Sequence, residues 1–332
     1  MVKKKEFNIP IALIIFKRKD TVLQIVKRLK EVGTKKIYLI SDQGRNEEEI
    51  QKVREARQAI EAAIDWDCDV EKNYAESNRG VYGNIALGAK WVFEREKWAI
   101  FLEDDNLPEL TFFPYCEELL ERYENDTRIM WICGTNYLGK YQPYDGASYM
   151  FTKHMLPCGW ASWSKKFLKF YDGEIELFRD PCVRKRFLED FPNKAMRDVY
   201  EAPLLRYEKE LKEGKYPYSW DYQMCLTVRA NSMFGISPVC NQIKNIGVDM
   251  DSEHGGNSMN KVMTRRFCGM PSYPLELPLK HPKAVMTDLE YEKKINYIVT
   301  PPLYMRLRHI IAKSLKCLMG KKQNEPLFKR NK

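Results

Sequence analysis

Three adjacent carboxylates, Glu103, Asp104 and Asp105, follow directly after the apolar run WAIFL at residues 98–102. Such a run predicts a buried β-strand, so the three acids are expected at its carboxyl end. Like charges this close repel one another and resist removal from water. The grouping therefore predicts a positively charged ligand, and a divalent cation such as Mg²⁺ or Mn²⁺ prefers hard carboxylate oxygens of this kind.

The same residues also allow a purely structural interpretation. A helix is predicted to begin near Pro108, and Asp105 or Asn106 would then cap its N-terminus, where the helix dipole favours negative charge. Three consecutive acids are a weak motif when taken alone. Their place at the end of a strand favours the ligand site, because a cation bound there would neutralise charge on a diphosphate leaving group.

A fourth carboxylate stands in an aromatic setting. Asp221 belongs to the segment YSWDYQM and has Tyr218, Trp220 and Tyr222 as close neighbours in sequence. Aromatic rings offer an apolar face on which a sugar can stack, and a carboxylate among them is suited to taking a proton from a hydroxyl group. The alternative is that Asp221 caps the helix that follows it.

The elements that must position these acids alternate regularly in the first half of the chain. Apolar, β-branched runs predict strands at 9–16, 35–42, 68–76, 98–105 and 129–136, and helical periodicity predicts helices at 20–32, 46–64, 81–97 and 109–124. This alternation predicts an α/β fold with a mostly parallel central sheet, in which ligands bind outside the carboxyl ends of the strands. Asp42, at the end of the second strand, is expected at the same edge.

The C-terminus has a different character. Within 301–322 one helical face is apolar, and it consists of Leu307, Ile310, Ile311, Leu315, Leu318 and Met319. The basic residues Arg306, Arg308, Lys313 and Lys316 fall elsewhere on the helix. A basic amphipathic helix predicts an anchor at a membrane surface. The alternative is a terminal helix that packs on the body of the protein and keeps its basic face in water.

The composition narrows the partners. The chain has 332 residues, a formal net charge of +9 and nine cysteines, none of them in a CxxC pair. The positive charge favours acidic partners such as nucleotides, phosphorylated lipids or an anionic membrane face. Binding to nucleic acid would account for the positive charge but for no other feature, because the sequence contains no recognised nucleic-acid-binding module. The odd number of cysteines predicts reduced thiols in a cytosolic protein, and no apolar segment is long enough to predict a transmembrane helix.

Several segments, in the same order along the chain, resemble the core of the N-acetylglucosaminyltransferase I type of glycosyltransferase and its bacterial relatives. These segments are IPIALIIFKRKDTV, YLISDQGRNEEE, SNRGVYGNIALGAKWVFE, EDD with NLPELTFFPYCEELLERY, GWASWSKKFL, SWDYQM and ISPVCNQIKNIG, which together span roughly residues 7–256. The resemblance implies a Rossmann-like GT-A fold. It also implies a nucleotide-sugar-binding half at 1–140, an acceptor-binding, catalytic α+β half of the same domain at 141–260, and a C-terminal extension at 261–332.

The resemblance implies a role for each matched residue of the donor site. Asp105 would be the direct metal ligand, Asp104 would face the ribose and the metal, and Glu103 would lie near the donor sugar. Asp42 would hydrogen-bond the nucleobase, and Arg18 would lie close to the nucleotide. The implied cofactor is Mn²⁺ or Mg²⁺, and the implied donor substrate is a nucleoside-diphosphate sugar, most simply a UDP-sugar.

The resemblance also covers the acceptor side. Asp221 would be the general base of an inverting displacement, which needs one carboxylate and no covalent intermediate. His254 would touch the diphosphate or the metal, and the alternative is a plain loop histidine. Arg79 would contact phosphate or stand on the surface. Trp160 and Trp163 would either line the acceptor cleft or belong to the core.

Together these patterns predict a metal-dependent inverting glycosyltransferase that moves a sugar to a saccharide acceptor. The basic tail and family habit suggest a polyprenyl-diphosphate-linked acceptor in bacterial surface glycan assembly. The enzyme is then expected in the cytoplasm, held peripherally on the anionic inner face of the cytoplasmic membrane through 301–322. Two alternatives stay open. One is a sugar nucleotidyltransferase, although the segment FKRKDT lacks the expected glycine-rich loop. The other is a non-catalytic saccharide- or membrane-binding protein on the same fold.

Overall fold

The computed structural model describes residues 6–248 and 261–320. Its centre is an eight-stranded sheet made of β1 (Ile11–Ile15), β2 (Lys36–Ser41), β3 (Asp69–Tyr74), β4 (Trp98–Glu103), β6 (Ile129–Cys133), β7 (Tyr149–Thr152), β8 (Trp160–Trp163) and β9 (Phe234–Pro238). The strand order is β3-β2-β1-β4-β8-β6-β9-β7. Only β8 and β7 run against their neighbours. The predicted α/β fold with a mostly parallel sheet is therefore confirmed.

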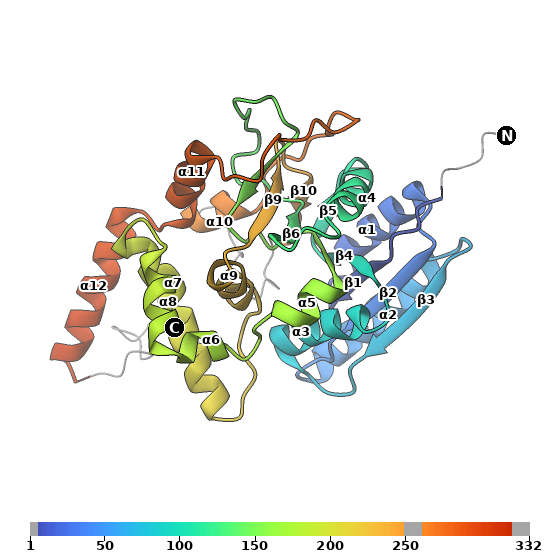
Figure 1. Ribbon diagram of the computed structural model, residues 1–332. Helices are drawn as coiled ribbons and strands as arrows, with labels where there is room; N and C mark the ends of the chain where they lie inside the picture. The colour runs from blue at the N-terminus through green and yellow to red at the C-terminus, as the bar shows by residue number, and fades with distance from the viewer. Residues whose placement is uncertain (1–5, 249–260, 321–332) are drawn as a thin grey trace.

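Helices cover both faces of the sheet and build a second body beside it (Figure 1). Those packed near the sheet are α1 (Lys19–Val32), α2 (Glu47–Ala63), α3 (Gly80–Phe93), α4 (Phe112–Arg122) and α5 (Ser164–Phe170). The others are α6 (Glu176–Arg179), α7 (Pro181–Glu189), α8 (Lys194–Lys212), α9 (Asp221–Ala230), α10 (Val262–Phe267), α11 (Leu289–Val299) and α12 (Leu303–Leu318). In the view of Figure 1, α9 lies between β1–β4 on one side and α12 on the other.

The strand alternation separates two apolar layers. Ile11, Leu13 and Ile15 of β1 belong to a buried cluster that also takes side chains of α1 and α4. Ala12 and Ile14 belong to a second cluster, which includes side chains of α3 and α9. Because successive side chains of a strand point to opposite faces, a fully apolar strand such as β1 requires helices on both sides.

A third apolar cluster lies among α6, α7, α8 and α9. Phe178, Phe187, Tyr200 and Leu226 are buried in it. The charged stretch 181–212 forms two helices, α7 and α8, on either side of a short break. This cluster gives the second body a core of its own and holds α9 from the side that faces away from the sheet.

The segment after the acidic triplet differs from the prediction. A helix was expected to include Pro108 in its first turn, but residues 106–108 form the short strand β5 (Asn106–Pro108). This strand pairs antiparallel with β10 (Ile243–Asn245), and proline tolerates the edge of such a ribbon because it needs no donor there. Helix α4 begins at Phe112 with Thr111 as its N-cap residue. The interpretation of Asp105 or Asn106 as a helix cap is therefore wrong.

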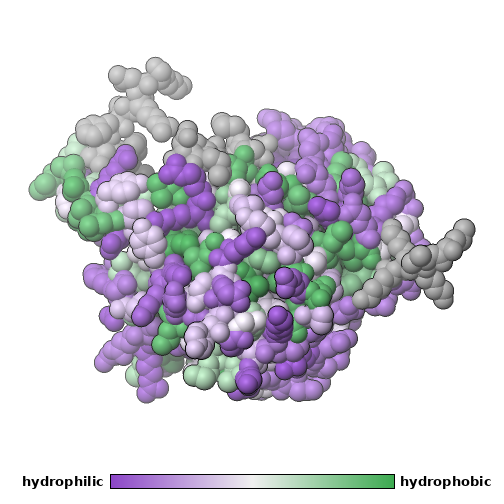
Figure 2. Space-filling model, turned by 90° about the horizontal axis from the view of Figure 1, so that it is seen from above, coloured by the Kyte–Doolittle hydropathy of each residue, from purple (hydrophilic) through white to green (hydrophobic). Residues whose placement is uncertain are grey.

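The last described helix, α12, lies at the edge of the molecule (Figure 1). None of its residues is buried. Figure 2 shows hydrophobic side chains gathered at the edge of the molecule where α12 lies. Among the described residues no helix combines the length and the apolar character that crossing a membrane requires.

A buried lysine joins α5 to the turn between α4 and β6. The Nζ atom of Lys166 donates hydrogen bonds to the carbonyl oxygens of Tyr123 at 2.6 Å, Asp126 at 2.8 Å and Ile129 at 2.8 Å. An ammonium group has three donors, so these three carbonyls satisfy it fully. Lys166 thereby fixes the helix that follows β8 against the strand that pairs with β8.

We expect Lys166→Met to lower the free energy of unfolding by about 2–4 kcal/mol, because three carbonyl oxygens lose their donor inside the protein. Equilibrium unfolding in urea measures this difference. Lys165→Met is the matched control, since Lys165 is exposed on the same helix. Its effect should stay within about 0.5 kcal/mol. An equal loss in both variants would contradict the structural role of Lys166.

Candidate active site

The strand order reverses at β1, and this places the candidate site. The chain runs from β1 outward through β2 to β3, and then returns to pair β4 with the other side of β1. At such a reversal the loops after the two central strands diverge and leave a crevice outside their carboxyl ends. Arg18, Asp42 and the acidic triplet follow the ends of β1, β2 and β4, so the topology brings the separately predicted residues to one edge.

The acidic triplet is tied to the loop after β1. Glu103 ends β4 opposite Ile14 of β1. The carboxylate of Asp104 accepts a hydrogen bond from the backbone N–H of Phe16 at 3.0 Å. The guanidinium of Arg18 donates to Oδ2 of Asp105 at 2.9 Å and lies 3.5 Å from Oδ1 of Asp104. One cation therefore lies between two of the three acids and holds the two loops together.

The site still carries an excess of negative charge. Burial, with the neighbouring charge of Asp105, raises the pKa of Asp104 to about 7, although Arg18 opposes the shift. Burial also raises the pKa of Glu103 well above its ordinary value, and the charges of Asp105, Asp104 and Asp221 add to this shift. Both groups resist ionisation mainly because burial disfavours the charged form, and one guanidinium does not balance the carboxylates around them. A bound cation would remove this imbalance.

Asp105 is held from both of its oxygens. Arg18 binds Oδ2, and the side-chain amide of Asn106 donates to Oδ1 at 2.5 Å. The amide oxygen of Asn106 in turn accepts the backbone N–H of Gly159 at 2.8 Å, and the Asn106 side chain is buried. From its sequence position, Asn106 was expected only as a possible helix cap. The structure shows that Asn106 orients the carboxylate of Asp105.

The segment after β10 passes directly over the triplet. The backbone N–H of Ile246 donates to the carbonyl oxygen of Asp105 at 2.9 Å, and Arg18 donates to the carbonyl oxygen of Gly247 at 3.2 Å. A Cβ atom at position 247 would lie 2.2 Å from Oδ2 of Asp105 and 2.8 Å from the Arg18 guanidinium. Only glycine allows this close approach, so the segment NIG is part of the site through its backbone.

Asp42 forms a second acidic point in the same cleft. One of its oxygens accepts the backbone N–H groups of Gln43 at 2.8 Å and Arg79 at 2.7 Å, and the other accepts the side-chain amide of Asn78 at 3.1 Å. Burial raises the pKa of Asp42, and these hydrogen bonds oppose the shift. The carboxylate of Asp42 is thus fixed in one orientation directly after the carboxyl end of β2.

Arg79 supports this arrangement from behind. Its guanidinium donates to the side-chain oxygens of Asn73 and Asn84, each at 3.1 Å, and lies 3.4 Å from the carbonyl oxygen of Ser41. Its side chain is not among those that line the cleft, and burial lowers its pKa. We therefore revise its expected role from a phosphate contact to a support for Asp42 and the N-terminus of α3.

Asp221 is the first residue of α9, and it faces the same cleft. The N-cap position belongs to Trp220, and no side-chain hydrogen bond caps this helix. The interpretation of Asp221 as a helix cap is therefore wrong. The hydroxyl group of Ser219 donates to one oxygen of Asp221. Asp221 and Glu103 both line this cleft, and the charge of Asp221 is one of those that raise the pKa of Glu103.

An aromatic stack connects Asp221 to the strands that carry the triplet. The ring of Trp160 stacks on Phe101 at 3.9 Å, on Trp131 at 4.1 Å and on Trp220 at 5.5 Å between centroids. Phe101 precedes Glu103 by two residues, and Trp220 precedes Asp221. Trp160 and Trp163 are only 1% and 2% exposed, so of the two expected placements the core is correct. The stack fixes the position of α9 relative to β4.

These residues border one cleft of about 950 Å³. It is lined by Arg18, Asp42 and residues 103–105 near the strand ends of the sheet, and by Asp221 at the start of α9. It is also lined by Val299, Pro301, Tyr304, Met305 and Arg308, and α12 lies on the other side of α9 from β4 (Figure 1). His254, predicted at the metal or the diphosphate, lies outside the described residues. The cleft therefore joins an acidic end at the sheet to an apolar, basic end at α12.

Three cleft residues were not singled out from the sequence. Lys17 and Arg45 line the cleft, as Asp42 does, and both bind the carboxylate of Glu49. The Nζ atom of Lys17 lies 2.9 Å from one Glu49 oxygen, and the guanidinium of Arg45 donates to both oxygens. Asn78 lines the cleft as well and orients Asp42. Each of the three follows a strand end or precedes a helix in a segment that resembles the glycosyltransferase core. Their expected position at the edge of the sheet could therefore have indicated that they belong to the site.

The residues present fit a hard divalent cation in their chemistry. Asp104 and Asp105 offer carboxylate oxygens, the preferred donors of Mg²⁺ and Mn²⁺, and the excess negative charge favours a cation. Within residues 6–248 and 261–320, no group of three or more His, Cys, Asp or Glu side chains is arranged to enclose a metal ion by itself. Such a cation would therefore need oxygens from its ligand as well, as Mg²⁺ sites at phosphates commonly do.

Comparisons with known proteins show only distant similarity. A scan against protein-family models and a search of curated proteins found no match. Among solved structures, UDP-glucose pyrophosphorylase complexed with UDP-glucose is 11% identical, with a TM-score of 0.37, over 72% of this chain and 94% of that one.

A second solved structure is glucosyl-3-phosphoglycerate synthase from Mycobacterium tuberculosis, in complex with Mn²⁺, UDP and glucosyl-3-phosphoglycerate. It is 7% identical, with a TM-score of 0.34, over 83% of this chain and 90% of that one. Likeness at this level carries no argument about activity. The function has to be inferred from the site itself.

The close approach at position 247 can be tested directly. We expect Gly247→Ala to lower the free energy of unfolding by about 1–3 kcal/mol, because the new methyl group must displace Asp105 or Arg18. In an Asp105→Gly background much of this cost should disappear, because the nearest atoms are gone. Urea unfolding of the double-mutant cycle measures both effects.

Gly235→Ala is the matched control, since a Cβ atom there meets nothing nearer than 3.6 Å. It should not destabilise the protein. If Gly247→Ala costs the same with and without the Asp105 side chain, the proposed contact between the two segments is wrong.

Proposed function

We propose that the protein is an inverting glycosyltransferase that uses a nucleoside-diphosphate sugar, most simply a UDP-sugar, as its donor. One observation carries the proposal. Asp221, from a segment far along the chain, lies in the same cleft as the triplet and near enough to raise the pKa of Glu103. A candidate cation site for a diphosphate and a candidate base for a hydroxyl group thus lie in one cleft, as a direct sugar transfer requires.

The proposed role of each residue in donor binding follows from its position in the cleft. The nucleoside would occupy the end of the cleft near Asp42 and Arg18, and the diphosphate would lie at residues 103–105. A divalent cation bound by Asp105, with His254 as a second expected ligand, would neutralise the charge that develops on the diphosphate. Arg18 already bridges Asp104 and Asp105 and would lie beside the same charge.

Asp221 would act on the acceptor. Its carboxylate takes the proton of the acceptor hydroxyl group as that oxygen bonds to the anomeric carbon. The bond from the anomeric carbon to the diphosphate oxygen breaks, and the nucleoside diphosphate leaves with the electron pair. Attack from the opposite face inverts the anomeric configuration, and no covalent intermediate forms. The ring of Tyr222 also lines the cleft and offers a face for the sugar.

A sugar nucleotidyltransferase and a non-catalytic binding protein are the competing functions. The first would transfer a nucleotidyl group to or from a sugar phosphate and would need no base for a sugar hydroxyl. The second would bind saccharide or membrane without turnover. A candidate base in the same cleft as the phosphate-binding residues favours glycosyl transfer over both, and the experiments below separate all three.

The first test is calorimetric titration of UDP, GDP, dTDP and CDP with and without Mn²⁺. We expect one nucleotide to bind in a metal-dependent manner, and Asp105→Asn to weaken its binding by about tenfold or more, since a metal ligand is lost. Glu189→Ala, an exposed acid on α7, is the control and should bind as the wild type does. Failure of every nucleotide to bind under every metal condition would contradict the enzyme proposal.

The second test uses the nucleotide sugar whose nucleotide binds. We expect slow release of the nucleoside diphosphate, with water in place of the acceptor, and a fall of about 10²–10⁴-fold in Asp221→Asn with nucleotide binding unchanged. Formation of a nucleoside triphosphate from nucleotide sugar and pyrophosphate would instead identify a nucleotidyltransferase. Nucleotide binding without any turnover would favour the non-catalytic function.

The exposed helix α12 bears on the acceptor. Leu307, Ile310 and Ile311 are 49%, 58% and 58% exposed, so the apolar face predicted from the sequence is uncovered in the folded chain. Residues 301–322 contain no acidic residue. Apolar exposure combined with basic charge is suited to an anionic membrane surface. On this basis we propose a lipid-linked saccharide acceptor, as in bacterial surface glycan assembly, and peripheral attachment to the inner face of the cytoplasmic membrane.

A further inference from the structure

The cleft and the exposed face of α12 belong to the same element. Tyr304, Met305 and Arg308 line the cleft, and Tyr304 and Arg308 stand one helical turn apart. Leu303, Leu307 and Ile310, spaced by four and three residues, define a different face of the helix. One wall of the cleft is therefore made by the helix whose other face is apolar and uncovered.

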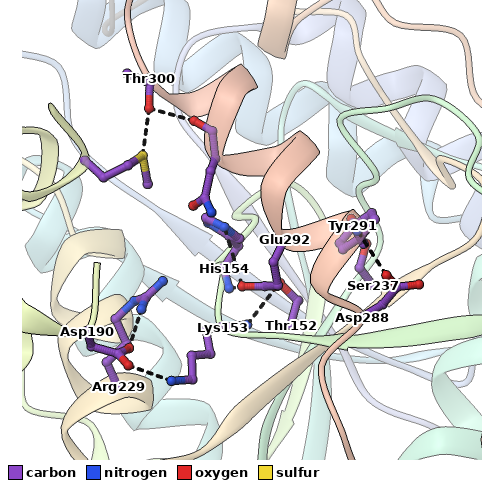
Figure 3. A network of polar contacts seen from close by, with 12 residues as sticks. Thr152, Lys153, His154, Asp190, Arg229, Ser237, Asp288, Tyr291, Glu292 and Thr300 are labelled. Carbon is purple, nitrogen blue, oxygen red and sulfur yellow. Dashed lines mark hydrogen bonds and ion pairs between the residues drawn. The ribbon is translucent and has the colours of Figure 1, made fainter. Parts of the chain in front are cut away.

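Helix α12 is positioned by α11, which is firmly attached to the body (Figure 3). Glu292 of α11 accepts hydrogen bonds from the Thr152 hydroxyl group and from the backbone N–H of Lys153 at 3.3 Å. The hydroxyl groups of Tyr291 and Ser237 lie 2.7 Å apart. These contacts join α11 to the ends of β7 and β9, so the point at which the chain enters α12 is fixed relative to the sheet.

The connection from α11 to α12 is short and stiff. Thr300, which ends α11, lies with its hydroxyl group 2.6 Å from the carbonyl oxygen of Asn296 and 2.7 Å from the sulfur atom of Met196 in α8. Pro301 and Pro302 follow, and α12 begins at Leu303. Two consecutive prolines restrict the backbone, so the direction of α12 against the cleft is set by its anchor rather than by packing of its own side chains.

Among residues 6–248 and 261–320, Arg308 is a cation without a counter-charge. Within the described part of the chain no hydrogen bond or ion pair to its guanidinium is present. It lines the cleft at the end opposite the acidic triplet. A guanidinium group matches the geometry of a phosphate group and can bind it through two parallel hydrogen bonds. The cleft thus has separate places for a donor diphosphate with its cation and for a second anionic group.

The charge pattern selects the partner of the uncovered face. In a two-fold symmetric dimer centred on this face, α12 would pack against another α12, and the segment 301–322 carries basic residues and no acid to pair with them. An anionic bilayer accepts the apolar residues among its acyl chains and the basic residues among its headgroups. The bilayer therefore satisfies both features at once.

We propose that the active-site cleft opens onto the membrane surface at α12, and that Arg308 binds the phosphate group of an acceptor lipid that stays in the bilayer. This inference rests on the proposed glycosyl transfer at Asp221, and it specifies the acceptor as a phosphate-bearing amphiphile. The saccharide head would enter the cleft past Arg308 toward Asp221 while the hydrocarbon chain remains among the lipids. The enzyme would act without extracting its acceptor from the membrane.

The test compares vesicle binding by the wild type, Arg308→Gln and Lys313→Gln. Each variant removes one positive charge from α12, but Lys313 does not line the cleft. Phosphatidylcholine vesicles that contain a long-chain isoprenyl phosphate are compared with vesicles in which phosphatidylglycerol supplies the same surface charge. We expect the wild type and Lys313→Gln to bind the isoprenyl phosphate vesicles about tenfold more tightly, and Arg308→Gln to bind both kinds alike.

The same experiment identifies the source of the phosphate and the role of the apolar face. The paired substitution Ile310→Glu and Ile311→Glu should abolish binding to both kinds of vesicle, and it should not unfold the protein because no α12 residue is buried. Inorganic phosphate at matched ionic strength should leave the preference intact. If it removes the preference, the ligand is a free anion and the proposal fails.

Three further outcomes would overturn the proposal: equal binding of the wild type to both vesicles, loss of the preference in Lys313→Gln as well, or a dimer formed through α12 in light scattering without vesicle binding. Nucleotide titration of each variant separates this inference from the proposed function. If nucleotide binds unchanged while the vesicle preference is absent, only the inference about Arg308 fails. If no nucleotide binds to the wild type, the proposed function fails whatever the vesicles show.

Discussion

The repulsion among three neighbouring carboxylates, Glu103, Asp104 and Asp105 at the buried end of β4, is the constraint to which the surrounding structure is fitted. Asp104 and Asp105 share a single guanidinium, that of Arg18, and the remaining repulsion shows in the raised pKa of Asp104 and Glu103. Every element around them contributes a fixed contact: the loop after β1, the ribbon of β5 and β10, and the backbone at Gly247. The protein thus holds an unfavourable charge arrangement rigidly, which is the condition for binding a cationic ligand with little reorganisation.

The first half of the fold could be predicted because its strands are continuous apolar runs separated by periodic helices. The α/β class follows from that alternation alone. The prediction failed directly after the triplet, where NLP forms β5 instead of a helical turn. Its partner β10 lies far away in sequence, and local periodicity carries no information about such a pairing.

The candidate site was predictable in its residue types and less so in their roles. Strand ends indicated Asp42 and the triplet, and an aromatic setting indicated Asp221. The requirement for glycine at position 247 could not be predicted from the sequence, because it arises from the close approach of this backbone to Asp105, which is far away in sequence. Arg79 was expected at a phosphate, and it instead holds the polar groups behind Asp42. Side-chain direction, which decides such cases, is set by tertiary packing and not by motif.

The aromatic stack has a consequence for how the chain is divided. Phe101 and Trp131 come from the part expected to bind the donor, while Trp160 and Trp220 come from the part expected to hold the acceptor. Residues 1–140 by themselves would expose the rings that the second part covers. We therefore expect the two parts to fold as one unit, in which case neither could be exchanged for a homologous module during evolution unless the rings of the stack changed together.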